Sequence, residues 1–232
     1  MNSAHPAPRA LDAIAVLFDL DGTLADTAGD LAGAVNRVRH DRGLPPVPVE
    51  MVRKHASSGA RGMLGAGMGV TPDDPDYPAL RDAFLAHYAK GLAETTRLFD
   101  GVDHLLAALD ARAIRWGIVT NKAARFTGPV TVALGLATRT PVIVSGDTTP
   151  HAKPHPAPLL HAAAQLGVDA MRCVYVGDDL RDVEAGNAAG MPTIVAQYGY
   201  VGGTTDPATW PATGWIERPG DLLAWLPAAA RT

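Results

Sequence analysis

FDLDGTL, at residues 18–24, follows directly on a short apolar run, residues 13–18, that is rich in β-forming residues. Asp19 and Asp21 stand two residues apart where the predicted strand ends, so their side chains point toward similar space. Gly22 lets the backbone turn and leaves its N–H unshielded. One carboxylate there can attack phosphorus and form an acyl phosphate, while the second donates or accepts the proton. An isolated Asp-x-Asp pair more often only caps a loop, so this interpretation depends on the rest of the chain.

Apolar strand-like runs alternate with helical patterns along most of the chain. Further runs of this kind lie at residues 114–119, 141–144, 173–176 and 193–195, and helical patterns lie at residues 104–113, 158–166 and 181–189. Such alternation is typical of a parallel sheet with helices on both faces. The sequence therefore predicts an α/β fold with a Rossmann-like parallel-sheet core.

One segment interrupts this alternation, because no convincing strand lies between about residues 26 and 96. Helical patterns cover residues 30–42, 49–55 and 80–90, and a glycine-rich stretch at residues 57–69 holds Arg61. We expect an inserted all-α cap domain at residues 26–94 and a core formed by residues 1–25 and 95–232. The hinges would lie near residues 24–27 and 94–99. The tail at residues 202–215 is rich in Gly, Thr and Pro and predicts irregular surface.

Composition excludes several classes of protein. The 232 residues are 47% hydrophobic and 19% charged, enough for a sizeable core, and the net charge of −4 does not suit a nucleic-acid-binding surface. No apolar run reaches membrane-spanning length, and the N-terminus does not resemble a signal peptide. The single cysteine, Cys173, cannot form an internal disulfide. These features predict a cytoplasmic protein with no membrane or nucleic-acid partner.

Two further signals follow predicted strands or lie in constrained loops. Thr120 and Asn121 end the run at residues 114–119, where a hydroxyl and a backbone N–H can hold phosphate oxygens, although such a pair is also ordinary turn chemistry. Lys153 precedes Pro154 on a restricted backbone. A phosphate dianion that approaches Asp19 needs fixed cations, because each like-charge pair at ~4 Å costs on the order of 4 kcal/mol at an effective dielectric of ~20.

An acidic cluster, GDDLRD at residues 177–182, follows the run at residues 173–176. Asp178 and Asp19 would together offer two hard oxygen ligands, and Mg²⁺ typically takes one or two protein carboxylates besides phosphate and water. Asp179 and Asp182 can be explained as residues that favour a helix N-terminus, or as neighbours of the metal ligands.

In this order, the motifs DLDGTL, Thr120-Asn121, Lys153-Pro154 and Gly-Asp-x-x-x-Asp resemble those of the haloacid dehalogenase-like superfamily. The resemblance covers nearly the whole chain and fits the phosphatase branch with a helical cap inserted after the first motif. It implies that Asp19 is the nucleophile, that Asp21 is the general acid and base with its carbonyl on Mg²⁺, and that Asp178 is a metal ligand. Thr120 would bind phosphate, and Lys153 would bridge the nucleophile and phosphate. Dehalogenases of the superfamily lack the second Asp and need no metal, which argues against that activity.

Within the superfamily, the chain looks most like bacterial phosphoglycolate phosphatases and is also similar to N-acetylmuramic acid 6-phosphate phosphatases. The resemblance implies a phosphomonoester hydrolase that acts on a small phosphorylated metabolite, with 2-phosphoglycolate as the first expected substrate. The stretches SGAR, residues 58–61, and GDDLRD lean toward the second group or another sugar-phosphate phosphatase. Many phosphoglycolate enzymes have Ser where Asp179 stands.

Substrate selectivity is expected to come from the cap. We expect Arg61 to contact the carboxylate or sugar of the substrate, with Gly22 and Asn121 also at the substrate. Solvated surface positions are expected for Lys122 and His55. A phosphomutase on the same scaffold and a non-enzymatic, receiver-like binder are the alternatives, although a receiver has no helical insert. The expected assembly is a monomer or a homodimer.

Overall fold

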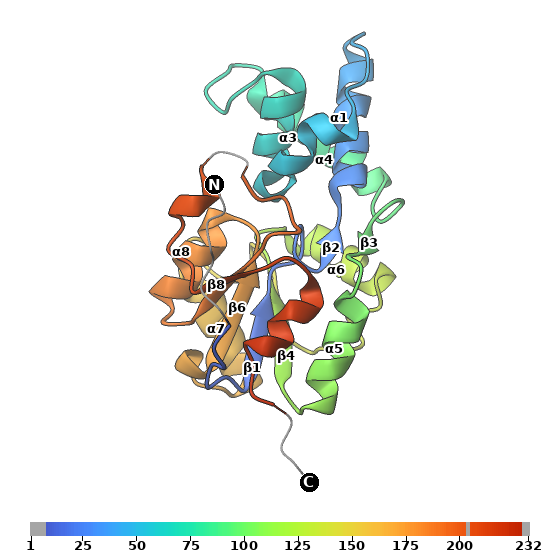
Figure 1. Ribbon diagram of the computed structural model, residues 1–232. Helices are drawn as coiled ribbons and strands as arrows, with labels where there is room; N and C mark the ends of the chain where they lie inside the picture. Colours follow the sequence, from blue (N-terminus) through green and yellow to red (C-terminus); the bar gives the residue numbers. More distant parts are fainter. Residues whose placement is uncertain (1–7, 203–204, 229–232) are drawn as a thin grey trace.

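The computed structural model describes residues 8–202 and 205–228, and its centre is a parallel sheet in the order β5-β4-β1-β6-β7-β8 (Figure 1). The strands are β1 (Ala15–Phe18), β4 (Arg115–Val119), β5 (Ile143–Val144), β6 (Cys173–Gly177), β7 (Thr193–Ala196) and β8 (Gly214–Ile216). Each pair of neighbours is parallel, and β1 lies between β4 and β6. The predicted α/β fold with a parallel-sheet core is confirmed.

Alternating side chains of β1 divide the core into two apolar layers. Val16 and Phe18 belong to the layer on one face, and Ala15 and Leu17 belong to the layer on the other. The first layer is covered by α5 (Val102–Ala111), α6 (Ala124–Ala133) and η4 (Pro219–Ala224), and the second by α7 (Ala157–Leu166) and α8 (Leu180–Ala188). Two short 3₁₀ turns, η2 (Ala170–Arg172) and η3 (Pro207–Thr209), complete the core. Among the helices of the described residues, none combines the length and the apolar character needed to cross a membrane.

The remaining helices gather at one end of the molecule, away from the sheet (Figure 1). They are α1 (Ala28–Asp41), α2 (Val49–Val52), η1 (Arg53–Ser58), α3 (Gly59–Met68) and α4 (Tyr77–Lys90). Their apolar faces form a cluster of their own, to which Phe126 and Tyr200 of the core are joined. Two antiparallel strands, β2 (Ala25–Asp26) and β3 (Arg97–Leu98), carry the chain into and out of this helical group. We propose that residues 26–94 act as the cap.

The structure corrects four details of the sequence-based expectations. The tail is not wholly irregular, because β8 extends the sheet and Trp210 is buried beside Val183 and Val195. The glycine-rich stretch at residues 57–69, for which the sequence predicts no helix, forms α3 and the end of η1. Helix α6 lies where no helix was expected. Asp26 belongs to the short strand β2, at the border of the segment expected to lack strands.

Candidate active site

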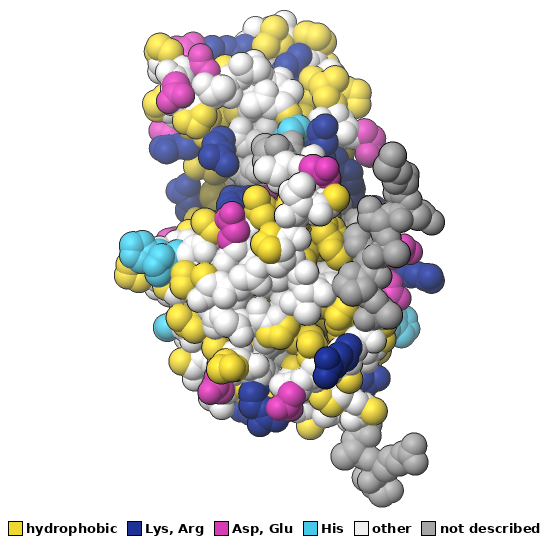
Figure 2. All heavy atoms as spheres, turned by 60° about the vertical axis from the view of Figure 1, so that its left-hand side comes forward, with side chains coloured by type: hydrophobic (Ala, Val, Ile, Leu, Met, Phe, Trp, Pro, Cys, Tyr) yellow, Lys and Arg dark blue, Asp and Glu magenta, His cyan; other side chains and the backbone are white. Residues whose placement is uncertain are grey.

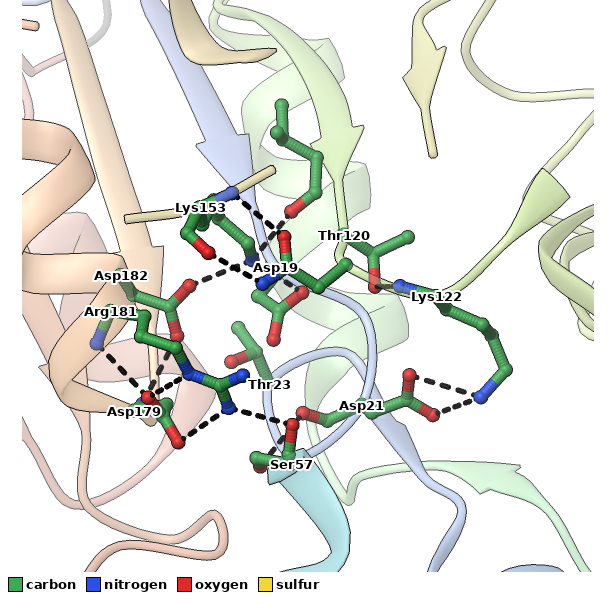
Figure 3. Close-up of polar contacts among 12 residues, drawn as sticks. Asp19, Asp21, Thr23, Ser57, Thr120, Lys122, Lys153, Asp179, Arg181 and Asp182 are labelled. Atoms are coloured by element: carbon green, nitrogen blue, oxygen red, sulfur yellow. Dashed lines mark hydrogen bonds and ion pairs between the residues drawn. The ribbon is translucent and has the colours of Figure 1, made fainter. Parts of the chain in front are cut away.

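The carboxyl ends of β1, β4 and β6 bring the predicted chemical groups to one edge of the sheet. Phe18 pairs in register with Ile118 and Val176, so Asp19, Thr120 and Asp178 follow at nearly the same level. Figure 3 shows Asp19 between Thr120 on one side and Lys153 and Asp182 on the other. Asp19, Thr120 and Lys153 line a cavity of about 320 Å³, and residues of the cap helices line its opposite side. Its volume is at the lower end of the range of small-molecule sites.

Asp19 and Lys153 form a buried ion pair at the floor of the cavity. Lys153 Nζ lies 2.8 Å from Asp19 Oδ1 and 2.7 Å from Asp182 Oδ1. The same ammonium donates to the backbone carbonyl of Val119, at 2.9 Å. Burial, with Asp182 nearby and only partial compensation from Lys153, raises the pKa of Asp19 to about 7. Two carboxylates share this one ammonium, so the group has a net negative charge when both are ionised, and such a group attracts a metal cation.

Two residues of the motifs, Asn121 and Asp182, hold Lys153 in place. Asn121 clamps the backbone of Lys153: its Nδ2 donates to Lys153 O at 2.8 Å, and its Oδ1 accepts from Lys153 N at 2.9 Å. Asn121 also lines the cavity, so the expected contact between its backbone N–H and the substrate stays a prediction. Asp182 pairs with the Lys153 ammonium and also accepts from the backbone N–H groups of Asp178 and Asp179, at 3.2 and 3.0 Å.

Asp21 is fixed by a lysine that lies far from it in the sequence. Lys122 Nζ lies 2.8 Å from Asp21 Oδ1 and 3.1 Å from Oδ2, and the hydroxyl of Thr27 donates to Oδ1 at 2.6 Å. Burial alone would lower the pKa of Lys122, but Asp21 and Tyr88 raise it above its ordinary value. The expectation of a solvated Lys122 was wrong, because this side chain is only 7% exposed and ion-paired.

Asp178 is packed against the turn that carries the first motif. Its Oδ1 accepts from Thr23 Oγ1 at 3.1 Å, and its Oδ2 accepts from Ser57 Oγ at 2.7 Å and from Tyr200 N at 3.0 Å. A Cβ atom on Gly22, whose φ is +86°, would lie 2.1 Å from Asp178 Oδ2. Gly22 is therefore required both for its backbone conformation and for the space that Asp178 fills. Burial and the neighbouring Asp19 and Asp182 raise the pKa of Asp178 well above its ordinary value.

Asp19, Asp178 and Asp182 form a buried group in which one carboxylate oxygen of each residue lies within 4.8 Å of the other two. Lys153 is the one ammonium that pairs with this group in the described residues, and it contacts Asp19 and Asp182. Asp19 and Asp178 then offer hard oxygen donors on neighbouring strand ends, and such donors suit a small divalent ion. The residues present fit a metal site.

The cap reaches the same edge of the sheet through Ser57. Besides its bond to Asp178, the Ser57 hydroxyl lies 3.5 Å from the carbonyl oxygen of Asp21, and its own carbonyl accepts from Arg181 at 2.9 Å. Arg181 in turn binds both oxygens of Asp179, at 2.8 and 2.9 Å (Figure 3). Asp179, which caps α8, therefore also orients an arginine that holds the cap backbone.

The cap residue expected to meet substrate is not one that lines the cavity. Arg61 lies exposed on α3, outside the cavity wall, and His55, on η1, is partly buried and also lies outside it. The wall instead contains residues to which the sequence assigned no role, among them Ser57, Tyr88, Arg125 and Arg181. Arg181 lies within the GDDLRD motif. For the other three, only the cationic or hydroxyl character of the side chain could have drawn attention to them.

Comparison with known proteins gives consistent matches. A family model described as haloacid dehalogenase-like hydrolase matches residues 16–196. An N-acetylmuramic acid 6-phosphate phosphatase of Pseudomonas aeruginosa is 43% identical over 215 residues, which cover 93% of this chain and 95% of that protein. A phosphoglycolate phosphatase of Xanthomonas campestris pv. campestris is 44% identical over 215 residues, which cover 93% and 96% of the two chains.

A solved structure from Haemophilus somnus 129PT, described as a predicted phosphoglycolate phosphatase, superposes with a TM-score of 0.79 and 26% identity. The superposition covers 91% of this chain and 97% of that one. The resemblance predicted from the motifs is confirmed, and the chain belongs to the haloacid dehalogenase-like hydrolase family.

Proposed function

We propose that this protein is a Mg²⁺-dependent phosphomonoester hydrolase that moves the phosphoryl group of a small metabolite to Asp19 and then to water. The observation that carries the proposal is that Asp19 and Lys153 pair in the wall of one cavity, while Asp178 lies directly behind them in one carboxylate group with Asp19. A nucleophilic carboxylate, a fixed cation and a metal site are the parts that phosphoryl transfer to an aspartate requires. The phosphatase names of the relatives support the same reaction class.

In the first step, a carboxylate oxygen of Asp19 attacks phosphorus, and the bond from phosphorus to the leaving oxygen breaks. Asp21 donates a proton to that oxygen. Lys153 offsets charge at Asp19 through its ion pair, and Thr120, which is buried and lines the cavity, can donate its hydroxyl to a phosphate oxygen. Bound between Asp19, Asp178 and the carbonyl of Asp21, Mg²⁺ would supply electrostatic stabilisation of the phosphate oxygens.

In the second step, Asp21 takes a proton from water, whose oxygen attacks phosphorus and releases Asp19 and inorganic phosphate. Both steps require the Asp21 carboxylate to keep one position. Lys122 and Thr27 hold it there, because both of its oxygens face the Lys122 ammonium and one also accepts from Thr27.

The replacement Asp19→Asn tests the reaction. Without a nucleophile, we expect steady-state phosphate release to fall at least about a thousandfold. Asp12→Asn is the matched control, because Asp12 is an exposed aspartate whose side chain is 86% exposed. An Asp19→Asn protein that keeps most of its activity would contradict the proposal. Product analysis excludes the mutase alternative if free phosphate appears in stoichiometric amounts, and inactivity against a broad phosphomonoester panel would favour the binder.

Two substrates are to be compared. The sequence predicts 2-phosphoglycolate first, and one observation favours N-acetylmuramic acid 6-phosphate as a second candidate. The cap side of the cavity is apolar and partly aromatic, with Leu31, Phe84, Tyr88 and Phe126 in its wall. Glycolate has little apolar surface to bury there, whereas a sugar with an acetamido and a lactyl group has more. A side-by-side measurement of kcat/KM for the two substrates decides between them.

A further inference from the structure

Four cationic side chains line the cavity, and three of them are already committed to carboxylates. Lys122 pairs with Asp21, and Lys153 pairs with Asp19 and Asp182. Arg181 binds both oxygens of Asp179. Arg125, in the first turn of α6, is the exception: it has no carboxylate partner among residues 8–202 and 205–228.

The Arg125 guanidinium is exposed toward the cavity and lies over an aromatic ring. Its Cζ is 4.6 Å from the ring centroid of Phe126, a contact that orients the planar group without using its N–H donors. Lys and Arg side chains gather where the helical end of the molecule meets the larger core (Figure 2). Within the cavity wall, Arg125 therefore offers a charge that the protein itself does not neutralise.

A second unsatisfied group lies on the same aromatic wall. Tyr88 of α4 is 2% exposed, and within the described part of the chain its hydroxyl has no hydrogen-bond partner. The Lys122 ammonium lies 4.8 Å from the Tyr88 ring centroid, but an ammonium only donates and cannot accept the hydroxyl proton. Tyr88 packs edge-on against Phe126 at 5.3 Å between centroids, so Phe126 joins Tyr88 to Arg125. A buried hydroxyl without a partner is costly and points to a ligand oxygen.

We propose that Arg125 binds a carboxylate on the leaving group of the substrate and that Tyr88 donates to an oxygen of the same group. The inference rests on the proposed function, because it concerns the part of the phosphomonoester that departs. A guanidinium matches a carboxylate with two parallel N–H···O bonds, and the partly closed wall strengthens this contact. Glycolate and N-acetylmuramic acid both carry a carboxylate, at different distances from phosphorus, so both candidate substrates enter the test. Arg125 thus takes the role that the sequence analysis expected of Arg61, a residue that lies outside the cavity wall.

Matched substrate pairs separate recognition of the carboxylate from chemistry at phosphorus. N-acetylmuramic acid 6-phosphate differs from N-acetylglucosamine 6-phosphate by the lactyl ether, and 2-phosphoglycolate differs from 2-hydroxyethyl phosphate by its carboxylate. p-Nitrophenyl phosphate supplies a leaving group without a carboxylate. We would measure kcat/KM on all five for the unmodified protein, Arg125→Gln, Tyr88→Phe, Arg61→Gln and Arg81→Gln. Arg81 is an exposed arginine on α4, paired with Asp82 and away from the cavity, and serves as the matched control.

For Arg125→Gln we expect kcat/KM to fall on the order of 10- to 100-fold on the carboxylate member of the preferred pair and to change little on its uncharged partner. For Tyr88→Phe we expect a loss of about three- to tenfold on the same substrate. Equal losses on both members of a pair, or a selective loss in Arg61→Gln instead, would overturn the subsite while leaving the phosphatase reaction intact. If the unmodified protein released phosphate from none of the five compounds, that result would contradict the proposed phosphatase function. The proposed subsite would then be contradicted as well, because it rests on that function.

Discussion

At the scale of single residues, the contact between Gly22 and Asp178 has the sharpest consequence. A Cβ atom at Gly22 would overlap the Asp178 carboxylate, so Gly22→Ala must displace a proposed metal ligand. A displacement of about 1 Å at a reacting centre can cost on the order of a hundredfold in rate, and we expect a loss of that size together with weaker Mg²⁺ dependence. Activity measured over a Mg²⁺ titration checks the prediction.

The control for this change is Gly43→Ala. Gly43 has a similar backbone conformation, with φ +68°, but nothing lies within 4 Å of a Cβ added there. Both variants carry the strain of a positive φ, and only Gly22→Ala should alter the metal response. Equal behaviour of the two variants would show that strain, and not the overlap with Asp178, is responsible.

Most residues of the motifs could be predicted from the sequence because they follow strands, and parallel strands bring their carboxyl ends together. The partners of those residues could not. Lys122 meets Asp21 across more than a hundred residues of the core chain, and the contact of Ser57 with Asp178 depends on how the cap sits on the core. Arg125 and Tyr88 carry no motif at all, and their importance lies in having no partner, which only the packed structure shows.

At the scale of elements, Asp30 ties the first cap helix to the returning chain. Its Oδ1 accepts from the backbone N–H and the hydroxyl of Thr95, at 2.7 and 2.6 Å, and its Oδ2 accepts from the hydroxyl and N–H of Thr96, at 2.6 and 3.2 Å. Asp30→Ala leaves these donors without their acceptor, which should cost about 2–4 kcal/mol. We expect Tm to fall by roughly 5–15 °C, measured by calorimetry.

Asp82→Ala is the control at this scale, because Asp82 lies exposed on α4 and, within the described residues, its ion pair is with the adjacent Arg81. It should leave Tm nearly unchanged. If Asp30→Ala unfolds at the same temperature as this control, the four bonds contribute nothing to the attachment of α1.

The sequence predicted long periodic elements better than short or glycine-containing ones. Strands β1, β4, β5, β6 and β7 coincide with the predicted apolar runs. Helix α3 contains several glycines, and α6 contains Pro129, so both give weak helical signals and depend on packing against their neighbours. Strand β8 has three residues, Gly214–Ile216, and forms only because β7 offers an unpaired edge.

At the scale of the whole molecule, the carboxylate group at the sheet edge should make stability depend on pH when metal is absent. The pKa of Asp19 rises from 3.8 to about 7, so between about pH 4 and pH 7 the folded state holds a proton that the unfolded state has lost. Stability of the metal-free protein therefore falls as pH rises through this window, by up to roughly 4 kcal/mol. The raised pKa of Asp178 acts in the same direction.

Urea unfolding in EDTA, at pH values on both sides of that window, measures this fall. Adding excess Mg²⁺ should stabilise the protein more at the upper end, since the ligands must be deprotonated to bind it. Asp19→Asn is the control, because it removes the titrating group and should flatten the profile. Stability that rose with pH in EDTA would contradict the charge excess inferred at this site.

The pairing of β2 with β3 has a consequence for how such a protein can change over generations. Ala25 faces Leu98 across this pair, so the chain leaves the sheet domain and returns to it at one point. A single contiguous segment can then be exchanged for another without rethreading any strand of the core. A chimaera that joins the helices of one relative to the sheet of another should keep the catalytic groups of the sheet donor. Its substrate preference should combine both parents, because Tyr88 lies in the exchanged segment and Arg125 lies in the sheet domain.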